Sequence, residues 1–321
     1  MNSNKTIITI AIIFIIAIVT FMALDFFGDF NKANKNVYDY KLDNFIIVDS
    51  SLINYKEVLQ IAPELEVLKA VTIDQNDNIY VSGDNSIFIY NNEGNLIKEI
   101  ITGTNALSIT VSHFGDIFLG AEDHIEVWNS NGIQKNIWET LNPNVLITSI
   151  ANIDSSVFVA DAGNKIVYHY DLEGNLLNEI GRKDSIAGID GFIIPSPYFD
   201  IAIGRDGELW VVNSGMHQLE SYDKEGNQIS SWKKTSMRLD GFSGCCNPSH
   251  IAILPNGSFV TSEKGIERVK IHEPSGKFKS VVAAPQQFEK GTRGLDLAID
   301  SENRIIILDP KKGRVRIFDK K

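Results

Sequence analysis

Short apolar runs alternate with polar turns along the chain beyond residue 45. An apolar triplet followed by a polar turn recurs six times, as IYVSGD (79–84), IFLGAE (117–122), VFVADA (157–162), LWVVNS (209–214), SFVTSE (258–263) and IIILDP (305–310). The middle residues of these copies lie near positions 80, 118, 158, 210, 259 and 306, with gaps of 38 to 52 residues. Runs this short, separated by turn residues, predict β-strands and an internal repeat.

Each copy predicts four short strands joined by tight turns. One apolar run precedes the triplet, another follows it, and a fourth strand comes next in most copies, as in NLIKEI and NLLNEI. Asp206-Gly207, Asn256-Gly257 and Glu173-Gly174 stand where a hairpin needs a residue with positive φ. A four-stranded sheet has two faces to cover, so repeats of this length predict the blades of a β-propeller. The fold class is therefore all-β, a six-bladed propeller with antiparallel blades.

The sixth copy ends at its third strand, because the sequence ends at Lys321. Residues 45–61, FIIVDSSLINYKEVLQI, are a β-like segment outside the six copies. We expect this segment to supply the missing strand, since a closed ring leaves no exposed sheet edge. The propeller is then expected to span residues 45–321.

Two copies carry the clearest resemblance to a known repeat. FVADAGNKIVYHYDLEGNLL (158–177) and WVVNSGMHQLESYDKEGNQI (210–229) resemble NHL repeats, with a "VAD" element, an "NxRIxxYD"-like stretch and a "GxxL" ending. The resemblance covers about residues 65 to 321. It implies a propeller, but NHL propellers include protein-binding modules, RNA-binding modules and a few enzymes, so it leaves the function open.

The N-terminus predicts a membrane anchor. After a short tail (residues 1–5), residues 6–24 form an uncharged apolar run, TIITIAIIFIIAIVTFMAL, long enough to cross a bilayer as a helix. The run lacks a small-residue cleavage site, which favours an uncleaved anchor over a signal peptide; cleavage would give a secreted protein. Residues 25–44 are expected to be a tether, with the propeller outside the cytoplasm of a single-pass membrane protein.

The net charge of −11, from 41 acidic and 30 basic residues, disfavours nucleic acid as a partner. The exception is the tail KKGRVRIFDKK (311–321), which holds six basic residues. Arg314 and Arg316 alternate there with Val315 and Ile317, which predicts a strand with one solvent-facing side in preference to a binding patch.

The residues that begin the first strand of each copy are expected to face the mouth of the central channel. They are Ala70, Ser108, Ser149, Asp200, His250 and Asp296. The last three lie on consecutive copies, and two carboxylates with an imidazole could hold a divalent cation. This resembles the peptidyl-hydroxyglycine lyases among NHL-like propellers, where several channel histidines bind a metal, although only His250 matches here. In the alternative interpretation, Asp200 and Asp296 bond backbone amides of neighbouring blades and His250 is a polar channel residue.

A second set of polar residues follows the apolar triplets. Its members are Asp84, Glu122, Asp161, Asn213, Glu263 and Asp309. Recurrence at equivalent places predicts a repeated structural duty, such as capping a turn, because catalytic groups would be expected in one blade only. Together these carboxylates would make one face acidic and favour cationic ligands or basic partners.

Both cysteines of the chain, Cys245 and Cys246, are adjacent in the stretch GFSGCCNPS (241–249). A disulfide between them would be strained, because neighbouring Cα atoms lie about 3.8 Å apart and disulfides usually need at least about 4.4 Å. Three interpretations remain: a vicinal disulfide that stiffens the loop, two buried thiols, or a redox or metal-binding loop. All three place the pair beside His250, on the loop that leads into the fifth blade.

These observations predict a propeller that binds a ligand or a protein at one face of the ring. The candidate ligand-binding residues are Asp200, His250, Asp296, Cys245 and Cys246. The alternative is a metal-dependent lyase or hydrolase that uses the first three of these residues. No catalytic residue is assigned, and no cofactor is predicted apart from that divalent metal ion. The sequence contains no nucleophile elbow, phosphate-binding glycine loop or zinc-type Cys/His spacing.

Overall fold

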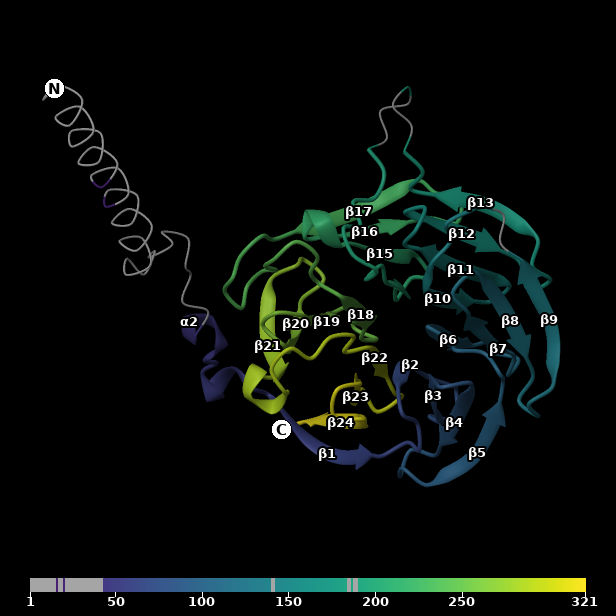
Figure 1. Ribbon diagram of the computed structural model, residues 1–321, viewed down its shortest axis with the longest axis horizontal. Coiled ribbons are helices and arrows are strands. Elements are labelled where there is room, and N and C mark those ends of the chain that lie inside the picture. Colours follow the sequence, from purple (N-terminus) through teal and green to yellow (C-terminus); the bar gives the residue numbers. More distant parts are fainter. Residues whose placement is uncertain (1–15, 17–19, 21–42, 140–141, 184–185, 187–189) are drawn as a thin grey trace, which may run out of the picture. The chain divides into compact units, whose positions relative to one another are not determined.

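Six four-stranded antiparallel sheets surround a central channel (Figure 1). The computed structural model describes residues 16, 20, 43–139, 142–183, 186 and 190–321. Residues 43–321 form one compact unit. The sheets are called blades 1 to 6 in chain order, and together they confirm the predicted six-bladed propeller.

Each blade is a meander whose four strands follow one another from the channel to the rim of the ring. Blade 1 contains β2 (Leu68–Ile73), β3 (Ile79–Gly83), β4 (Ser86–Tyr90) and β5 (Leu96–Ile101). Blade 2 contains β6 (Ser108–Val111), β7 (Ile117–Gly120), β8 (His124–Trp128) and β9 (Gln134–Glu139). Blade 3 contains β10 (Ile147–Ile153), β11 (Ser156–Asp161), β12 (Ile166–Tyr170) and β13 (Leu176–Ile180).

The other three blades repeat this plan. Blade 4 contains β14 (Ile201–Ile203), β15 (Leu209–Asn213), β16 (Gln218–Tyr222) and β17 (Gln228–Lys233). Blade 5 contains β18 (His250–Ile253), β19 (Phe259–Glu263), β20 (Arg268–His272) and β21 (Phe278–Ala283). Blade 6 contains β22 (Leu297–Ile299), β23 (Ile305–Asp309), β24 (Arg314–Lys320) and β1 (Tyr55–Ile61). Short helices are α2 (Asp43–Ile46), η1 (Ser50–Leu52), η2 (Ser214–Met216) and η3 (Pro285–Gln287).

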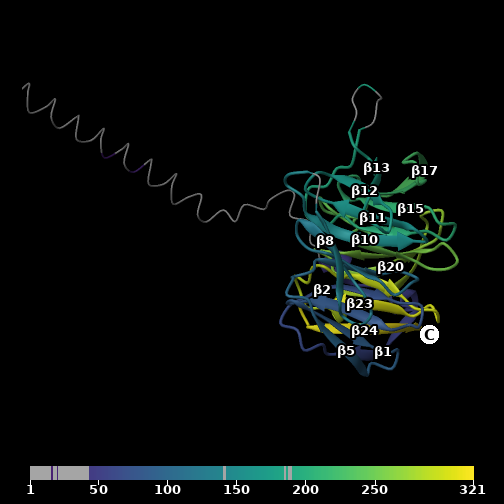
Figure 2. The same ribbon diagram turned by 90° about the vertical axis from the view of Figure 1, so that its right-hand side faces the viewer.

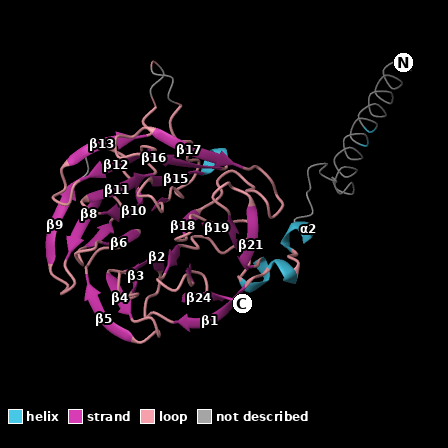
Figure 3. Cartoon of the chain, turned by 180° about the vertical axis from the view of Figure 1, so that it is seen from behind, coloured by secondary structure: helices cyan, strands magenta, loops and turns pink. Residues whose placement is uncertain are grey.

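The figures separate inner from outer strands. In Figures 1 and 3, β2, β6, β10 and β18 lie toward the centre of the ring, and β5, β9, β13 and β21 lie at its rim. Figure 2 turns the ring by 90°, with β1 and β5 at one edge and β13 and β17 at the other. The inner strands therefore surround the channel, as the repeat pattern predicts.

Blade 6 is completed from the other end of the sequence. Its strand order is β1-β24-β23-β22, and β1 pairs antiparallel with β24 from Tyr55↔Lys320 to Ile61↔Val315. The segment 45–61 therefore supplies the missing strand, as predicted, and the strand itself spans Tyr55–Ile61. It covers the edge of β24 that would otherwise be open.

Apolar side chains fill the space between neighbouring blades. One cluster joins Phe158 and Ala160 of blade 3 to Ile201 and Val211 of blade 4. Because each sheet buries both faces in this way, its second and third strands are almost wholly buried, as in Ile79–Gly83 and Ser86–Tyr90. The predicted turn glycines Gly174, Gly207 and Gly257 all have positive φ, between 80° and 89°.

The tail 311–321 contains the predicted strand, but the prediction of a solvent-facing side is wrong at Arg316. The strand β1 covers β24, so the Arg316 side chain is only 2% exposed. Its guanidinium donates to both carboxylate oxygens of Glu57 on β1, at 2.9 and 2.8 Å, and to Asp309 on β23 at 3.2 Å. The alternation of charged and apolar residues could not reveal that another strand lies outside this one.

The predicted membrane segment 6–24 lies outside the described residues, apart from Ile16 and Thr20. Among the residues that the structure describes, no helix has the length and apolar character to cross a bilayer.

Replacing Arg316 is expected to weaken the closure of the ring. Arg316→Met would leave Asp309, whose side chain is 1% exposed, as a buried and unpaired carboxylate. We expect a loss of about 3–5 kcal/mol in the free energy of unfolding, measured by equilibrium urea denaturation.

Arg314→Met is the matched control, because Arg314 lies on the same strand and forms no carboxylate pair among the described contacts. Its effect should stay within about 0.5 kcal/mol. Equal losses in the two variants would contradict the role assigned to Arg316.

Candidate functional site

The central channel encloses a cavity of about 420 Å³. It is lined by residues of β2, β6, β10, β14, β18 and β22, the inner strands of all six blades. The six positions expected at the mouth all lie among the lining residues: Ala70, Ser108, Ser149, Asp200, His250 and Asp296. Residues at or near the start of the first strand of each blade therefore line the channel, as predicted.

Asp200 and Asp296 bond the backbone of the next blade. Asp200 Oδ2 accepts from the amide of Ile251 in blade 5 at 2.7 Å. Asp296 Oδ2 accepts from the amide of Val71 in blade 1 at 2.8 Å. Each inner strand is the edge of its sheet, so the backbone amides on its free side need acceptors that the sheet itself does not provide. The structure thus confirms the interpretation in which these carboxylates link neighbouring blades.

His250 lies between the two carboxylates. Its Nδ1 is 3.4 Å from Asp296 Oδ1 and 3.8 Å from Asp200 Oδ2. The ring of Tyr198 packs edge-on against the imidazole, with ring centres 5.9 Å apart. The other nitrogen, Nε2, is buried and has no hydrogen-bond partner among the described residues. A buried polar atom without a partner is costly, so Nε2 is well placed to receive a ligand, as is the Ser108 Oγ atom in the same lining.

The pKa values of Asp200 and His250 are both shifted in this cluster. Burial raises the pKa of Asp200 to about 6, and the nearby Asp296 also raises it, while His250 and the Ile251 amide oppose the rise. Burial lowers the pKa of His250, but the hydrogen bond to Asp296 and the charges of both carboxylates outweigh burial, so the pKa lies above its usual value. The cluster therefore holds a proton more firmly than isolated side chains would.

The hypothesis that Asp200, His250 and Asp296 bind a divalent metal finds no geometric support. Within the described part of the chain, no group of three or more His, Cys, Asp or Glu side chains is placed to hold a metal ion. The carboxylates point one oxygen each at a backbone amide, which keeps them apart as inter-blade links.

Three members of the second set have the structural duty that recurrence predicts, whereas Glu122 is exposed and its side chain forms no such bond among the described contacts. Asp84, Asp161 and Asn213 accept from the backbone amides of Val67, Leu146 and Ile193, respectively, in the segments that lead into the inner strands of their own blades.

In blades 5 and 6 the equivalent carboxylates, Glu263 and Asp309, instead pair with Arg268 and Arg316. The expectation of an acidic face from this set is therefore wrong for these two, because buried cations neutralise them.

The cysteines lie on the loop that leads into β18, as predicted. Both are free thiols; Cys245 is exposed, and Cys246 is 3% exposed. Neither is among the residues lining the channel cavity. The interpretation of two buried thiols is correct for Cys246 alone.

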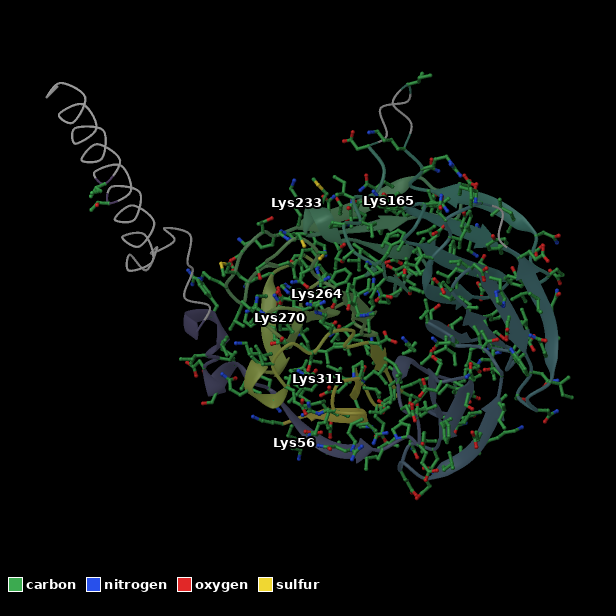
Figure 4. The ribbon with its side chains drawn as sticks, viewed as in Figure 1. Lys56, Lys165, Lys233, Lys264, Lys270 and Lys311 are labelled. Atoms are coloured by element: carbon green, nitrogen blue, oxygen red, sulfur yellow. The ribbon has the colours of Figure 1, made fainter. Side chains whose placement is uncertain are left out.

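Buried charges of blade 5 fix this loop. Glu263 pairs with Arg268 at 2.8 Å and with Lys270 at 2.7 Å, and all three side chains are fully buried. Arg268 and Lys270 donate in turn to the carbonyl oxygen of Gly241 in the loop. Figure 4 shows Lys264 and Lys270 on the sheet of β18 to β21. The loop is thereby anchored to blade 5 just before the cysteines.

Sequence reasoning missed three residues beside the cysteines: Ser196, Tyr198 and Lys264. The Lys264 ammonium donates to Ser196 Oγ at 2.9 Å and lies 3.9 Å from the centre of the Tyr198 ring. Ser196 and Tyr198 belong to the connection between β13 and β14, which makes the gap between the third and fourth copies the longest. That long gap was the available signal, since insertions in a repeat often carry function.

The opposite opening of the channel holds a larger cavity of about 920 Å³. It is lined by residues at the far ends of inner strands and in the following turns, including His113 and Phe114. The 72% exposed Phe114 makes this opening partly apolar.

Comparison with known proteins places the chain by fold. No protein-family model matches it, and no curated protein matches it. A structure of streptogramin B lyase matches with a TM-score of 0.58 at 11% identity, covering 85% of this chain and 100% of the other.

Two further structures match at similar levels. A catalytically inactive virginiamycin B lyase from Staphylococcus aureus with quinupristin gives a TM-score of 0.55 at 15% identity, covering 79% of this chain and 80% of the other. A chain of the mitotic checkpoint complex gives 0.60 at 9% identity, covering 85% and 94%. At such low identity the likeness shows the propeller fold alone.

Replacing Asp200 is expected to change how stability depends on pH. A carboxyl group with a raised pKa adds stability below its unfolded pKa of about 3.8, and this is lost as the pH rises through about 6. Asp200→Asn keeps an oxygen that can accept from the Ile251 amide. Because asparagine does not ionise, the variant does not lose stability through this side chain as the pH rises. The variant should gain stability relative to the native chain as the pH rises from about 4 to about 7. The gain is reduced by the stability that His250 loses when the Asp200 charge no longer raises its pKa.

Urea denaturation at a series of pH values measures this difference. His169 and His272, whose pKa values are lowered by burial, titrate in both proteins, so their contributions cancel. Asp154→Asn, in an exposed turn with φ of 51°, is the control and should follow the native curve. A pH-independent difference for Asp200→Asn would contradict the account of the cluster.

Proposed function

We propose that the protein is an NHL-type propeller that binds a small polar ligand at the channel mouth formed by Asp200, His250 and Asp296. The observation that carries the proposal is the buried, unpartnered Nε2 of His250 beside a cavity of about 420 Å³. Concave sites with a few polar groups are where propellers and other folds bind ligands. The likeness of copies three and four to NHL repeats supports the repeat type.

The charges at the mouth limit the class of ligand. Nδ1 of His250 faces the two carboxylates, which favours a proton on that nitrogen and keeps the imidazole in one orientation. A protonated His250 would donate from Nε2 to an oxygen of the ligand. Because two carboxylates flank the imidazole, a neutral carbonyl or hydroxyl oxygen suits the mouth better than a carboxylate or phosphate group.

The surroundings of the mouth suit a binding role. The Tyr198 ring packs next to His250. Lys264 packs on the Tyr198 ring and also lies near Cys246, so it connects Tyr198 to the anchored loop that carries both cysteines. A rigid rim of this kind lowers the entropic cost of binding. The proposal includes the membrane anchor at residues 6–24 and an exported propeller, supported by the apolar run in the sequence.

Thermal unfolding of the full chain with a panel of small polar compounds tests this function. A compound that binds at the mouth should stabilise the native protein by about 2.7 kcal/mol at one hundred times its dissociation constant. His250→Gln should lose that stabilisation, because it removes the imidazole nitrogen that the ligand needs.

His113→Gln is the matched control, because His113 lies at the opposite opening of the channel. It should keep the stabilisation. Loss of binding in His113→Gln with retention in His250→Gln would move the site to the other opening and overturn the proposal.

The alternative hypothesis, a metal-dependent lyase or hydrolase, makes a different prediction. Under the proposal of a binding module, we expect a chelator to leave the melting temperature of the native chain unchanged, since the carboxylates serve as links between blades. Scanning calorimetry with and without chelator measures this directly. A fall in melting temperature with chelator that His250→Ala abolishes would favour the metal-dependent enzyme.

A further inference from the structure

Cys245 and Cys246 are two neighbouring thiols that differ in their exposure to solvent. Their sulfur atoms are 3.1 Å apart, and the side chains differ in access to solvent, with Cys245 exposed and Cys246 buried. A bond between the sulfurs requires them to close to about 2.05 Å, a short movement. External reagents therefore meet Cys245 first, and Cys246 is positioned to react with whatever forms on Cys245.

The buried thiol has a polar environment built from two other segments. The Lys264 ammonium and the Ser196 hydroxyl both lie close enough to the Cys246 sulfur to stabilise its negative charge. Lys264 is held in turn by Ser196 and by the face of the Tyr198 ring. Asn247 fixes the loop next to it, donating to the carbonyls of Ser243 and Lys264 and accepting from the Lys264 amide. An ammonium group beside a thiol is the usual setting of a reactive cysteine.

The pKa values of the two thiols are shifted in opposite directions. Burial raises the pKa of Cys246, but hydrogen bonds from Lys264, Ser196 and Cys245 outweigh it and leave the pKa below its usual value. The hydrogen bond to Cys246 and the charge on that sulfur raise the pKa of Cys245. When the reduced pair holds one proton, these contacts favour that proton on Cys245 and the negative charge on Cys246.

We propose that Cys245 and Cys246 are a reversible dithiol–disulfide site that reacts with low-molecular-weight disulfides. In the first step Cys245 passes its proton to Cys246 and attacks the external disulfide. A Cys245–SR bond forms, the external S–S bond breaks, and one RS⁻ leaves.

In the second step that RS⁻ takes the proton from Cys246 and becomes RSH. The Cys246 thiolate then attacks the Cys245 sulfur, the Cys245–SR bond breaks, and the second RS⁻ leaves. The dithiol loses two electrons and the external disulfide gains them, so charge and atoms balance. The product is a disulfide between adjacent residues, which is strained and thus readily reduced again by thiols.

Oxidation would also change the channel mouth. It removes the negative charge that Lys264 and Ser196 stabilise, and Lys264 packs on Tyr198, which in turn packs on His250. The redox state of the pair is thereby connected by direct contacts to the mouth. The dithiol chemistry itself needs no ligand in the channel, so it stands or fails separately from the proposed function.

The test uses the full chain equilibrated at several ratios of reduced to oxidised glutathione, then alkylated and examined by peptide mass spectrometry. The native chain should change from two alkylated cysteines to a peptide lacking two hydrogen atoms and any alkyl group as the ratio falls. Cys246→Ser should instead accumulate glutathione on Cys245, and Cys245→Ser should remain unmodified.

Failure of the native chain to form the internal disulfide at any ratio would overturn the proposal. The same conclusion would follow if Cys245→Ser reacted as fast as the native chain. Because the first readout uses the native chain, it does not depend on whether a variant folds.

The positioning role of Lys264 has a separate readout. Lys264→Met should slow closure of the mixed disulfide by about tenfold near neutral pH and move the rate–pH profile to higher pH, because the thiolate loses its cation. Lys279→Met, an exposed position on β21 of the same blade, is the control and should keep the native profile. Identical profiles for the two variants would remove Lys264 from the site.

Discussion

The pairing of β1 with β24 is the interaction on which the rest of the structure depends. Each sheet of the ring buries its faces only against its neighbours, so six sheets form a stable core only when the ring closes. The closing strand comes from residues 55–61 and pairs with the last strand of the chain. Arg316 reinforces the join by bonding Glu57 across the two strands and Asp309 behind them. Without this closure, the channel and its mouth would have no fixed geometry.

The same need to satisfy sheet edges determines the chemistry of the channel. Six inner strands expose backbone amides toward one narrow space, and buried amides require acceptors. Asp200 and Asp296 supply them, each from the preceding blade. These two carboxylates also surround His250 and change its protonation. The same side chains therefore both link neighbouring blades and set the protonation of His250, and neither recurrence nor residue type alone could reveal both effects.

Much of this architecture could be predicted from the sequence. Periodic apolar runs specify strands, the Asp-Gly and Asn-Gly turns specify hairpins, and the missing fourth strand of the sixth copy points to residues 45–61. The contacts between segments could not be predicted in the same way. Nothing in the alternation of Arg314 and Arg316 with apolar residues shows that β1 lies over Arg316. Likewise, the pairing of Lys264 with Cys246 joins loops whose approach depends on how the blades pack.

The repeated and unrepeated parts of the chain have different tasks. The repeats build a ring that many unrelated proteins share, as the low identity of the matching structures shows. The residues around the dithiol come instead from two connections that lengthen the gaps between copies: Ser196 and Tyr198 before blade 4, and Cys245 and Cys246 before blade 5. Lys264, just after β19, joins the two connections through Ser196 and Cys246. A scaffold needs neither insertion to close, and both insertions converge on the Lys264 ammonium, so the features that distinguish this chain from a bare ring are concentrated at this side of the mouth.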